Sequence, residues 1–356
     1  MFFQLKLSNF LYNIEMKIKI AVLFVLLLFG GAIIATEIFP NINKNGIASD
    51  NNDGGIESTV HPLSIETLRT GEYPGSDFVI EQTLEPSSNY SRYVASYKSE
   101  GLKIYGLLTI PNNVPENGLP AIVFNHGYIA PSVYRTTEKY VAYQDAFARS
   151  GYITFKSDYR GHGNSEGIAS GGYGSNDYTI DVLNAVSSIQ KMDEVDPTRI
   201  GMWGHSMGGH ITLESMVVNP DVKVGVIWAG VVGSYEDIFD RWRRRSPERP
   251  SPSPGTRGYW RVELQNENGS PQENLDFWRS LSATSYLDEI SGPIQLHHGT
   301  ADSSVDVELS VNLDKLLKES DQESEIFLYE GDDHNISNNL STALARSVEY
   351  FDKFLK

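Results

Sequence analysis

The chain has 356 residues, of which 40% are hydrophobic and 21% charged, a composition typical of a globular protein. Its net charge of −17 argues against nucleic acid as a partner, because phosphate would be repelled. The sequence contains no cysteine, which excludes disulfides, thiolate metal sites, a lipidated N-terminal cysteine and a catalytic cysteine.

Residues 1–36 are predicted to be a signal peptide or a membrane anchor. Residues 18–35 are almost continuously apolar, are interrupted mainly by Lys19, and follow further lysines. Basic residues before such a run indicate that the rest of the chain is translocated, secreted or anchored to the membrane by this segment. Cleavage stays open, because Ala32 and Ala35 do not form an Ala-x-Ala site and the run is long enough to span a bilayer.

Residues 37–77 are predicted to be a linker and lead-in. The part up to residue 60 is rich in Asn, Asp, Gly and Ser. The run at residues 50–55 resembles a calcium loop in composition only, because it lacks the alternation and the glutamate of an EF-hand. A flexible tether is therefore the preferred interpretation.

From residue 78 onward the pattern predicts strands that alternate with helices. The expected strands cover 78–84, 90–98, 102–110, 121–125, 152–155, 199–203, 224–228, 294–297 and 325–329. The expected helices cover 138–150, 177–192, 211–218, 307–319 and 340–355. This order predicts an α/β protein with a mostly parallel, doubly wound sheet that is entered by an antiparallel hairpin.

The segment Gly-His-Ser-Met-Gly at residues 204–208 is the centre of the predicted chemistry. A Gly-x-Ser-x-Gly between a strand and a helix is typical of a nucleophile elbow, in which Ser206 stands on a strained turn. Glycines at 204 and 208 would allow the neighbouring backbone to crowd the serine. The following helix would direct its N-terminus at a developing oxyanion. A plain glycine-rich turn is the alternative.

Two further candidates follow the last two predicted strands. The order Ser206, Asp302, His334 is the order of a Ser-Asp-His triad in this kind of fold. His334 would accept the serine proton, and Asp302 would hold the imidazole and stabilise its charged form. Asp302 could instead only cap the next helix, and the neighbouring Asp332 or Asp333 could supply the acid.

An oxyanion hole needs two backbone N–H groups. Met207 would supply one from the elbow. The loop after the strand at 121–125 would supply the other, and we assign it to Tyr128, because Gly127 permits the turn that directs this amide inward. His126 is expected to brace the loop rather than to act as a base.

Five motifs in order resemble one known family. They are His-Gly at 126–127, Asp-Tyr-Arg-Gly-His-Gly-Asn-Ser at 158–165, Gly-His-Ser-Met-Gly-Gly at 204–209, His-Gly-Thr-Ala-Asp at 298–302 and Asp-His at 333–334. Residues 78–356 thereby resemble the α/β-hydrolases of the prolyl oligopeptidase and acyl-esterase branch. The resemblance implies an α/β-hydrolase fold and hydrolysis of an ester or amide through an acyl-enzyme, without metal or organic cofactor.

Two departures bear on the substrate. The oxyanion loop has His-Gly-Tyr at 126–128 where many members have His-Gly-Gly. Fewer than 80 residues precede the first predicted strand, whereas prolyl oligopeptidases proper carry a β-propeller there. We therefore expect a carboxylesterase first, a peptidase acting on short peptides second, and a catalytically silent binding protein third. The acyl group, the leaving group and the oligomeric state stay open.

Residues 234–285 interrupt the alternation and are predicted to form a cap over the active site, with an irregular surface excursion as the alternative. Candidate substrate-binding residues are Trp242, Tyr259 and Trp260. Between residues 241 and 261 there are seven arginines and a single acid, Glu248. These arginines would either favour an anionic substrate or pair with the acidic catalytic domain.

Overall fold

The computed structural model describes residues 60–244, 254, 256 and 258–356, and of residues 240–244 only the backbone. The predicted targeting segment and the Asn- and Asp-rich run after it lie outside the described residues. Among the helices that the structure describes, none is both long and apolar enough to cross a membrane.

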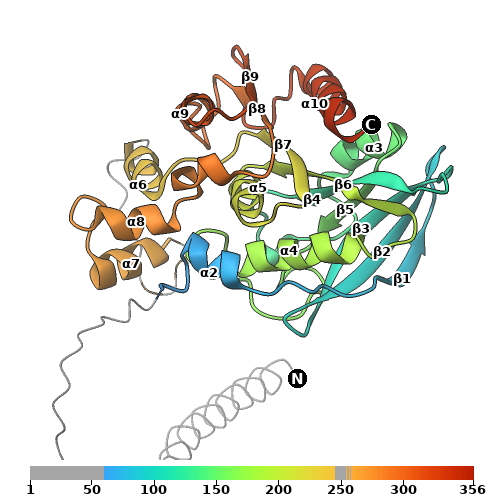
Figure 1. Ribbon diagram of the computed structural model, residues 1–356, viewed down its shortest axis with the longest axis horizontal. Coiled ribbons are helices and arrows are strands. Elements are labelled where there is room, and N and C mark those ends of the chain that lie inside the picture. Colours follow the sequence, from blue (N-terminus) through green and yellow to red (C-terminus); the bar gives the residue numbers. More distant parts are fainter. Residues whose placement is uncertain (1–59, 245–253, 255, 257) are drawn as a thin grey trace, which may run out of the picture. The chain divides into compact units, whose positions relative to one another are not determined.

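In the described part of the chain, nine strands form one sheet in the order β1-β2-β3-β5-β4-β6-β7-β8-β9 (Figure 1). The strands are β1 (Val79–Leu84), β2 (Tyr90–Ser99), β3 (Leu102–Pro111), β4 (Leu119–Asn125), β5 (Ile153–Ser157), β6 (Val195–His205), β7 (Val222–Trp228), β8 (Ile294–Gly299) and β9 (Ser324–Tyr329). The first three strands are antiparallel, β3 pairs antiparallel with β5, and all later pairs are parallel. The predicted α/β fold is confirmed.

Helices cover both faces of this sheet, which is why the central strands are almost wholly apolar. One face packs against α4 (Asp177–Ile189), α5 (Met207–Val218) and α9 (Glu308–Glu319). The other face packs against α3 (Val141–Arg149) and α10 (Leu340–Leu355), whose Phe147 and Phe351 rings meet at 5.4 Å. The carboxyl ends of the parallel strands thus meet at one edge, between two layers of helices.

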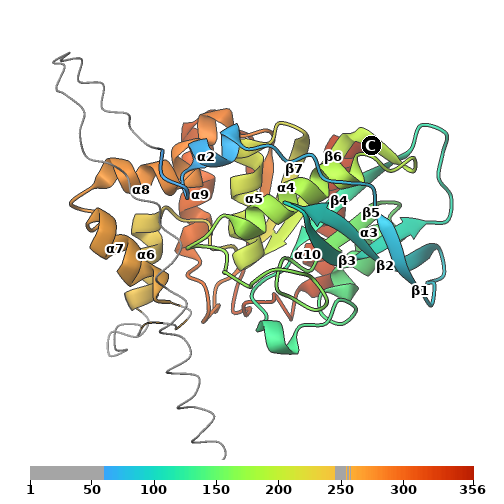
Figure 2. The ribbon, with the colours of Figure 1, turned by 90° about the horizontal axis from the view of Figure 1, so that it is seen from below.

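The insertion between β7 and β8 contains α6 (Tyr235–Arg244), α7 (Trp260–Asn268) and α8 (Leu275–Leu281), followed by the short 3-10 turns Ala283–Ser285 and Leu287–Glu289. Its helices share a small core of their own around Phe239, Leu264 and Trp278. In both views these helices lie together near α2 (Ile65–Thr70), on the side of the described structure away from β1 (Figures 1 and 2).

Three local differences from the sequence-based expectation have simple causes. Helix α2 has only six residues and is too short to show a periodicity. Ser64 Oγ caps it by accepting the N–H of Thr67 at 3.1 Å. Helix α5 begins at Met207, four residues before the expected start. The sequence placed the start too late because the two glycines that follow Met207 have a weak helix propensity. Strand β6 begins at Val195, ahead of exposed residues that mask its pattern.

Candidate active site

Ser206 occupies the turn between β6 and α5. Its backbone angles are φ 57° and ψ −118°, a region that non-glycine residues rarely adopt and that is found where surrounding structure enforces it. The N–H of Ser206 donates to the carbonyl of Trp228 at 3.0 Å, and its carbonyl accepts the N–H of Val231 at 3.1 Å. The strained turn expected from the motif is therefore present and is held from the neighbouring strand β7.

The two glycines of the motif are required by packing. A Cβ added at residue 208 would collide with the carbonyl oxygen of Asn125 at the end of β4. A Cβ at Gly204 would collide with the carbonyl of Gly208 and the hydroxyl of Thr212 in α5. The elbow consequently brings helix α5 and the loop after β4 into direct backbone contact, as predicted.

Asp302 and His334 form a direct hydrogen bond. The Nδ1 atom of His334 lies 2.7 Å from Oδ2 of Asp302. The other oxygen of Asp302 accepts the N–H groups of Ser304 and Val305 at 2.7 and 3.0 Å. The carboxylate is fully buried and its orientation is fixed, whereas the imidazole of His334 keeps 20% of its surface exposed. The backbone bonds also show that Asp302 shapes the turn after β8, but Ser304 and Val305 precede α9 (Glu308–Glu319), so these bonds do not cap that helix, the alternative role considered for Asp302.

His298 is a second partner of the same carboxylate, one that the sequence did not single out. Its Nε2 lies 3.1 Å from Oδ2 of Asp302, and its Nδ1 lies 2.7 Å from the hydroxyl of Ser310. Burial raises the pKa of Asp302, but the hydrogen bonds from His298 and His334 outweigh it and hold that pKa well below its usual range. The carboxylate is thus anionic at neutral pH. The signal for His298 was its place at the end of an apolar strand.

Asp332 and Asp333, the neighbouring acids, have other partners. Asp332 is buried and accepts the backbone N–H groups of Asn338 and Asn339, each at 3.0 Å. Asp333 accepts the N–H of Ser337 at 3.0 Å and its hydroxyl at 2.8 Å. Both carboxylates therefore shape the loop after β9, and only Asp302 is hydrogen-bonded to the imidazole of His334 in the described structure.

The loops that carry the candidates meet at the elbow. The rings of His205 and His334 have centroids 4.6 Å apart, and Nε2 of His205 lies 2.9 Å from the carbonyl oxygen of His334. From the other side, a Cβ added at Gly127 would stand 3.1 Å from Cβ of Ser206. The loop after β9 and the loop after β4 therefore both contact the Ser206 turn or the residue before it.

The two residues assigned to an oxyanion hole belong to the two elements that meet here, Met207 to α5 and Tyr128 to the loop after β4. Met207 is the first residue of α5, so its N–H has no acceptor within the helix. Tyr128 directly follows Gly127 and is 45% exposed. The positive end of the α5 dipole lies at Met207.

His126 braces the loop after β4, as expected. It is fully buried, and its ring is stacked between Tyr134 and Tyr159 with centroid distances of 4.8 and 4.3 Å. Burial lowers the pKa of His126 to about 3, so the ring is neutral. Its Nδ1 lies 2.7 Å from the carbonyl oxygen of Gly127. Such a ring holds the loop in place and has no access to solvent.

The cap candidates are only partly described. The side chain of Trp242 and most of the arginine cluster lie outside the described residues. Tyr259 immediately precedes α7 and is partly exposed. Trp260 stacks on Tyr173 at 6.2 Å, and Tyr173 in turn contacts His210 of α5 at 4.9 Å. Trp260 thus packs onto the helix that follows the elbow, with one aromatic layer between them.

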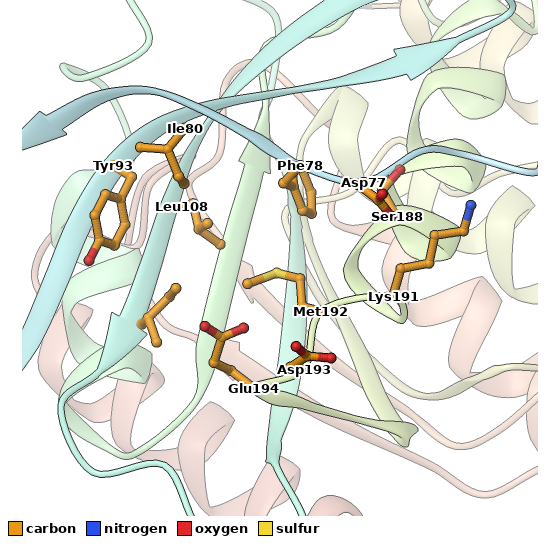
Figure 3. A pocket seen from close by; sticks show the side chains of 11 residues that line it. Asp77, Phe78, Ile80, Tyr93, Leu108, Ser188, Lys191, Met192, Asp193 and Glu194 are labelled. Atoms are coloured by element: carbon orange, nitrogen blue, oxygen red, sulfur yellow. The ribbon is translucent and has the colours of Figure 1, made fainter.

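A hollow of about 530 Å³ lies elsewhere, where β1 to β3 meet the end of α4 (Figure 3). Apolar side chains, among them Phe78, Leu108 and Met192, line it, and Asp193 and Glu194 are among its charged residues. None of the candidate catalytic residues borders it. In the described ranges, no group of three or more His, Asp or Glu side chains is arranged to hold a metal ion.

Comparison with known proteins identifies the family. The model of the prolyl oligopeptidase family matches residues 139–356, more than half of the chain. The chain belongs to the prolyl oligopeptidase family. This segment contains the Ser206 elbow and the loops of Asp302 and His334.

The curated relatives of this chain include dipeptidyl peptidases. Dipeptidyl peptidase 4 of Sus scrofa is 28% identical over 162 residues, which are 45% of this chain and 19% of that protein. The chain therefore spans about a fifth of the length of that curated relative.

Solved structures establish the α/β-hydrolase fold. Acylaminoacyl peptidase of Pyrococcus horikoshii superposes with a TM-score of 0.60 and 23% identity, covering 76% of this chain and 43% of that one. Est1E of Butyrivibrio proteoclasticus, solved with bound ferulic acid, superposes with a TM-score of 0.55 and 22% identity, covering 73% of this chain and 98% of that one. Together with the family match, these neighbours support a serine hydrolase, either an esterase or a peptidase.

Proposed function

We propose that this protein is a serine hydrolase that cleaves a carboxylic ester through an acyl-enzyme, with Ser206 as nucleophile, His334 as general base and acid, and Asp302 as the group that orients His334. The observation that carries the proposal is the 2.7 Å bond between His334 Nδ1 and the buried Asp302 carboxylate, in a loop that also contacts the residue before Ser206. A nucleophile on a strained turn beside such a pair is the arrangement that acyl transfer requires.

The steps follow from the atoms that are present. The carboxylate of Asp302 fixes the proton of His334 on Nδ1, so that Nε2 carries the lone pair. Nε2 accepts the proton of Ser206 as Oγ attacks the acyl carbon, and then donates it to the departing alkoxide. The alcohol leaves and the acyl group stays on Ser206. A water molecule then attacks this ester, with His334 again as base, and releases the carboxylic acid.

Two backbone amides would stabilise the tetrahedral intermediate. The N–H of Met207 lies at the start of α5, where the helix dipole is positive, and the N–H of Tyr128 belongs to the loop that contacts Ser206. Because both donors belong to the backbone, they would be in place before charge develops on the substrate oxygen. Removing one donor of such a pair typically lowers kcat by about 10²- to 10³-fold.

Two observations support an ester over a peptide. Est1E, whose solved structure holds ferulic acid, superposes on 73% of this chain. Trp260 of the insertion stacks on Tyr173, which contacts His210 of α5, so an acyl or aryl group bound beside that helix would have an aromatic surface to contact. Hydrolysis of short peptides is the second candidate, favoured by the 28% identity with dipeptidyl peptidase 4.

The test compares an ester and an amide of the same acyl group. We expect the purified protein to hydrolyse alkyl esters, followed by acid release at constant pH, far faster than the matched amides and aminoacyl arylamides. Alkyl esters are preferred because activated aryl esters also acylate peptidases. Faster cleavage of the arylamides would make the protein a peptidase. No turnover of either class, with no labelling by a fluorophosphonate, would make it a silent binding protein.

We also propose that the protein acts outside the cytoplasm, secreted or tethered by its N-terminal segment. The support is the lysine-flanked apolar run at residues 18–35. Fractionation of cells that express the full chain tests this proposal, and recovery of all the protein in the soluble cytoplasmic fraction would contradict it.

A further inference from the structure

Three hydrogen bonds connect the oxyanion loop to the loop of His334. The N–H of Gly127 donates to the hydroxyl of Tyr140 at 3.0 Å. The same hydroxyl lies 2.7 Å from Nδ1 of His205, and Nε2 of His205 lies 2.9 Å from the carbonyl oxygen of His334. Residues that are far apart in sequence are thus joined through one tyrosine and one histidine.

Chemistry fixes which partner donates in each of these three hydrogen bonds. A carbonyl oxygen only accepts, so Nε2 of His205 carries a proton and donates to His334. Burial lowers the pKa of His205 to about 3, so the ring is neutral and its Nδ1 is an acceptor. The hydroxyl of Tyr140 must therefore donate to Nδ1, while its oxygen accepts the N–H of Gly127. All three bonds are satisfied in one proton arrangement.

Tyr140 is also held in a strained backbone conformation. Its angles are φ 65° and ψ 6°, in the left-handed region that bulky residues rarely enter. It immediately precedes α3 and makes no side-chain capping bond to that helix. Such outliers persist only where the surrounding structure enforces them, and they cluster at functional sites. Capping of α3 therefore does not explain the conformation of Tyr140.

A buried lysine is bonded to the segment that leads to Tyr140. Lys156 of β5 is 0% exposed, and its ammonium donates to the carbonyls of Thr136 and Lys139, at 2.9 and 2.7 Å. Asp158 accepts the hydroxyls of Tyr134 and Thr136, at 2.7 and 2.5 Å. A buried charge is costly unless it is bonded, and here both charged groups bond the segment that ends at Tyr140. This segment is thereby attached to the centre of the sheet.

We propose that Tyr140 is a positioning residue that couples the oxyanion loop to the His334 loop through His205, and that Lys156 holds Tyr140 in the conformation this requires. The inference rests on the proposed serine hydrolase function. To stabilise the tetrahedral intermediate, the Tyr128 amide and the His334 imidazole must both be correctly placed around the same substrate carbonyl group. Tyr140 connects the backbones of both loops, so its hydroxyl sets their relative placement.

The test is Tyr140→Phe in the full-length protein, with Tyr143→Phe as the matched control. Both variants lose one phenolic hydroxyl in the same stretch, but Tyr143 packs its ring on Trp203 and Trp228, and its hydroxyl makes no hydrogen bond in the described structure. Because a small misplacement of a reacting group costs about 10²-fold, we expect Tyr140→Phe to lower kcat about 10- to 100-fold with KM little changed. Tyr143→Phe should keep the kcat of the wild type.

A trifluoromethyl ketone, whose adduct mimics the oxyanion, separates positioning from general destabilisation. Its inhibition constant for Tyr140→Phe should rise by the same factor by which kcat/KM falls. A lower melting temperature with unchanged kcat and inhibition constant would overturn the proposal. If Tyr140→Phe does not fold, Lys156→Gln should show the same loss of kcat at constant KM, and unchanged kcat there would overturn it. A wild type without turnover or labelling would refute the proposed function itself, and the coupling with it.

Discussion

Two regions of this protein place ionisable groups beside apolar surface, and they differ in how those groups are bonded. At the elbow, Asp302 is fully buried and bonded to two histidines and two backbone amides. In the hollow beside β1, Asp193 and Glu194 have solvent-exposed surface and form no ion pair within the described structure. The hollow has the size of an ordinary ligand site, yet neither of these two carboxylates is held by a hydrogen bond in the described structure.

Backbone strain shows the same contrast. Ser206 and Tyr140 have positive φ angles and lie where loops from three strands converge. None of the residues that line the hollow has such an angle. Fixed charges and enforced strain are thus concentrated at the carboxyl edge of the parallel strands, and they indicate the reactive site better than the size of a hollow does.

The largest effect that can test this comparison is expected at Asp302. Asp302→Asn should lower kcat by about 10⁴-fold with the fold retained, because His334 would lose the anion that fixes its tautomer. The matched control is Asp333→Asn. Asp333 lies beside His334 in the loop after β9, and its substitution alters hydrogen bonds to Ser337 but none to the imidazole. Steady-state kinetics on one ester measures both. A loss of kcat in Asp333→Asn as large as that in Asp302→Asn would contradict the assignment of Asp302 as the carboxylate that orients His334.

The sequence predicts this site because its signals are local. The motif around Ser206 and the strand ends before Asp302 and His334 are contiguous in the chain, and the parallel sheet brings strand ends together. The crowding at Gly208 followed from the same motif. Fold class and the candidate triad therefore need no long-range information.

The supporting bonds could not be predicted in this way. Tyr140 and His205 are 65 residues apart, and no local pattern indicates that they meet. In the sequence, Lys156 looks like an ordinary solvent-exposed lysine of a strand. The structure shows that it is fully buried. The helices α7 and α8 of the insertion have only nine and seven residues, so a helical period is hard to recognise in them.

The smallest effect is expected in the hollow. The double variant Asp193→Asn and Glu194→Gln should keep kcat/KM within about twofold of the wild type, since unpaired surface charges contribute little to stability or to a distant site. The same ester assay and a thermal melt check it. A drop of the size expected for Tyr140→Phe would show that the hollow is coupled to catalysis, and the contrast between the two regions would fail.

The central claim is that Ser206 is the nucleophile. It is tested most directly by labelling the purified protein with a fluorophosphonate and locating the adduct by mass spectrometry of its peptides. The account predicts one phosphonylated serine, Ser206, and a Ser206→Ala variant that takes up no label and loses turnover on the order of a millionfold. An adduct on another serine, or a Ser206→Ala variant that still hydrolyses esters at the wild-type rate, would contradict it.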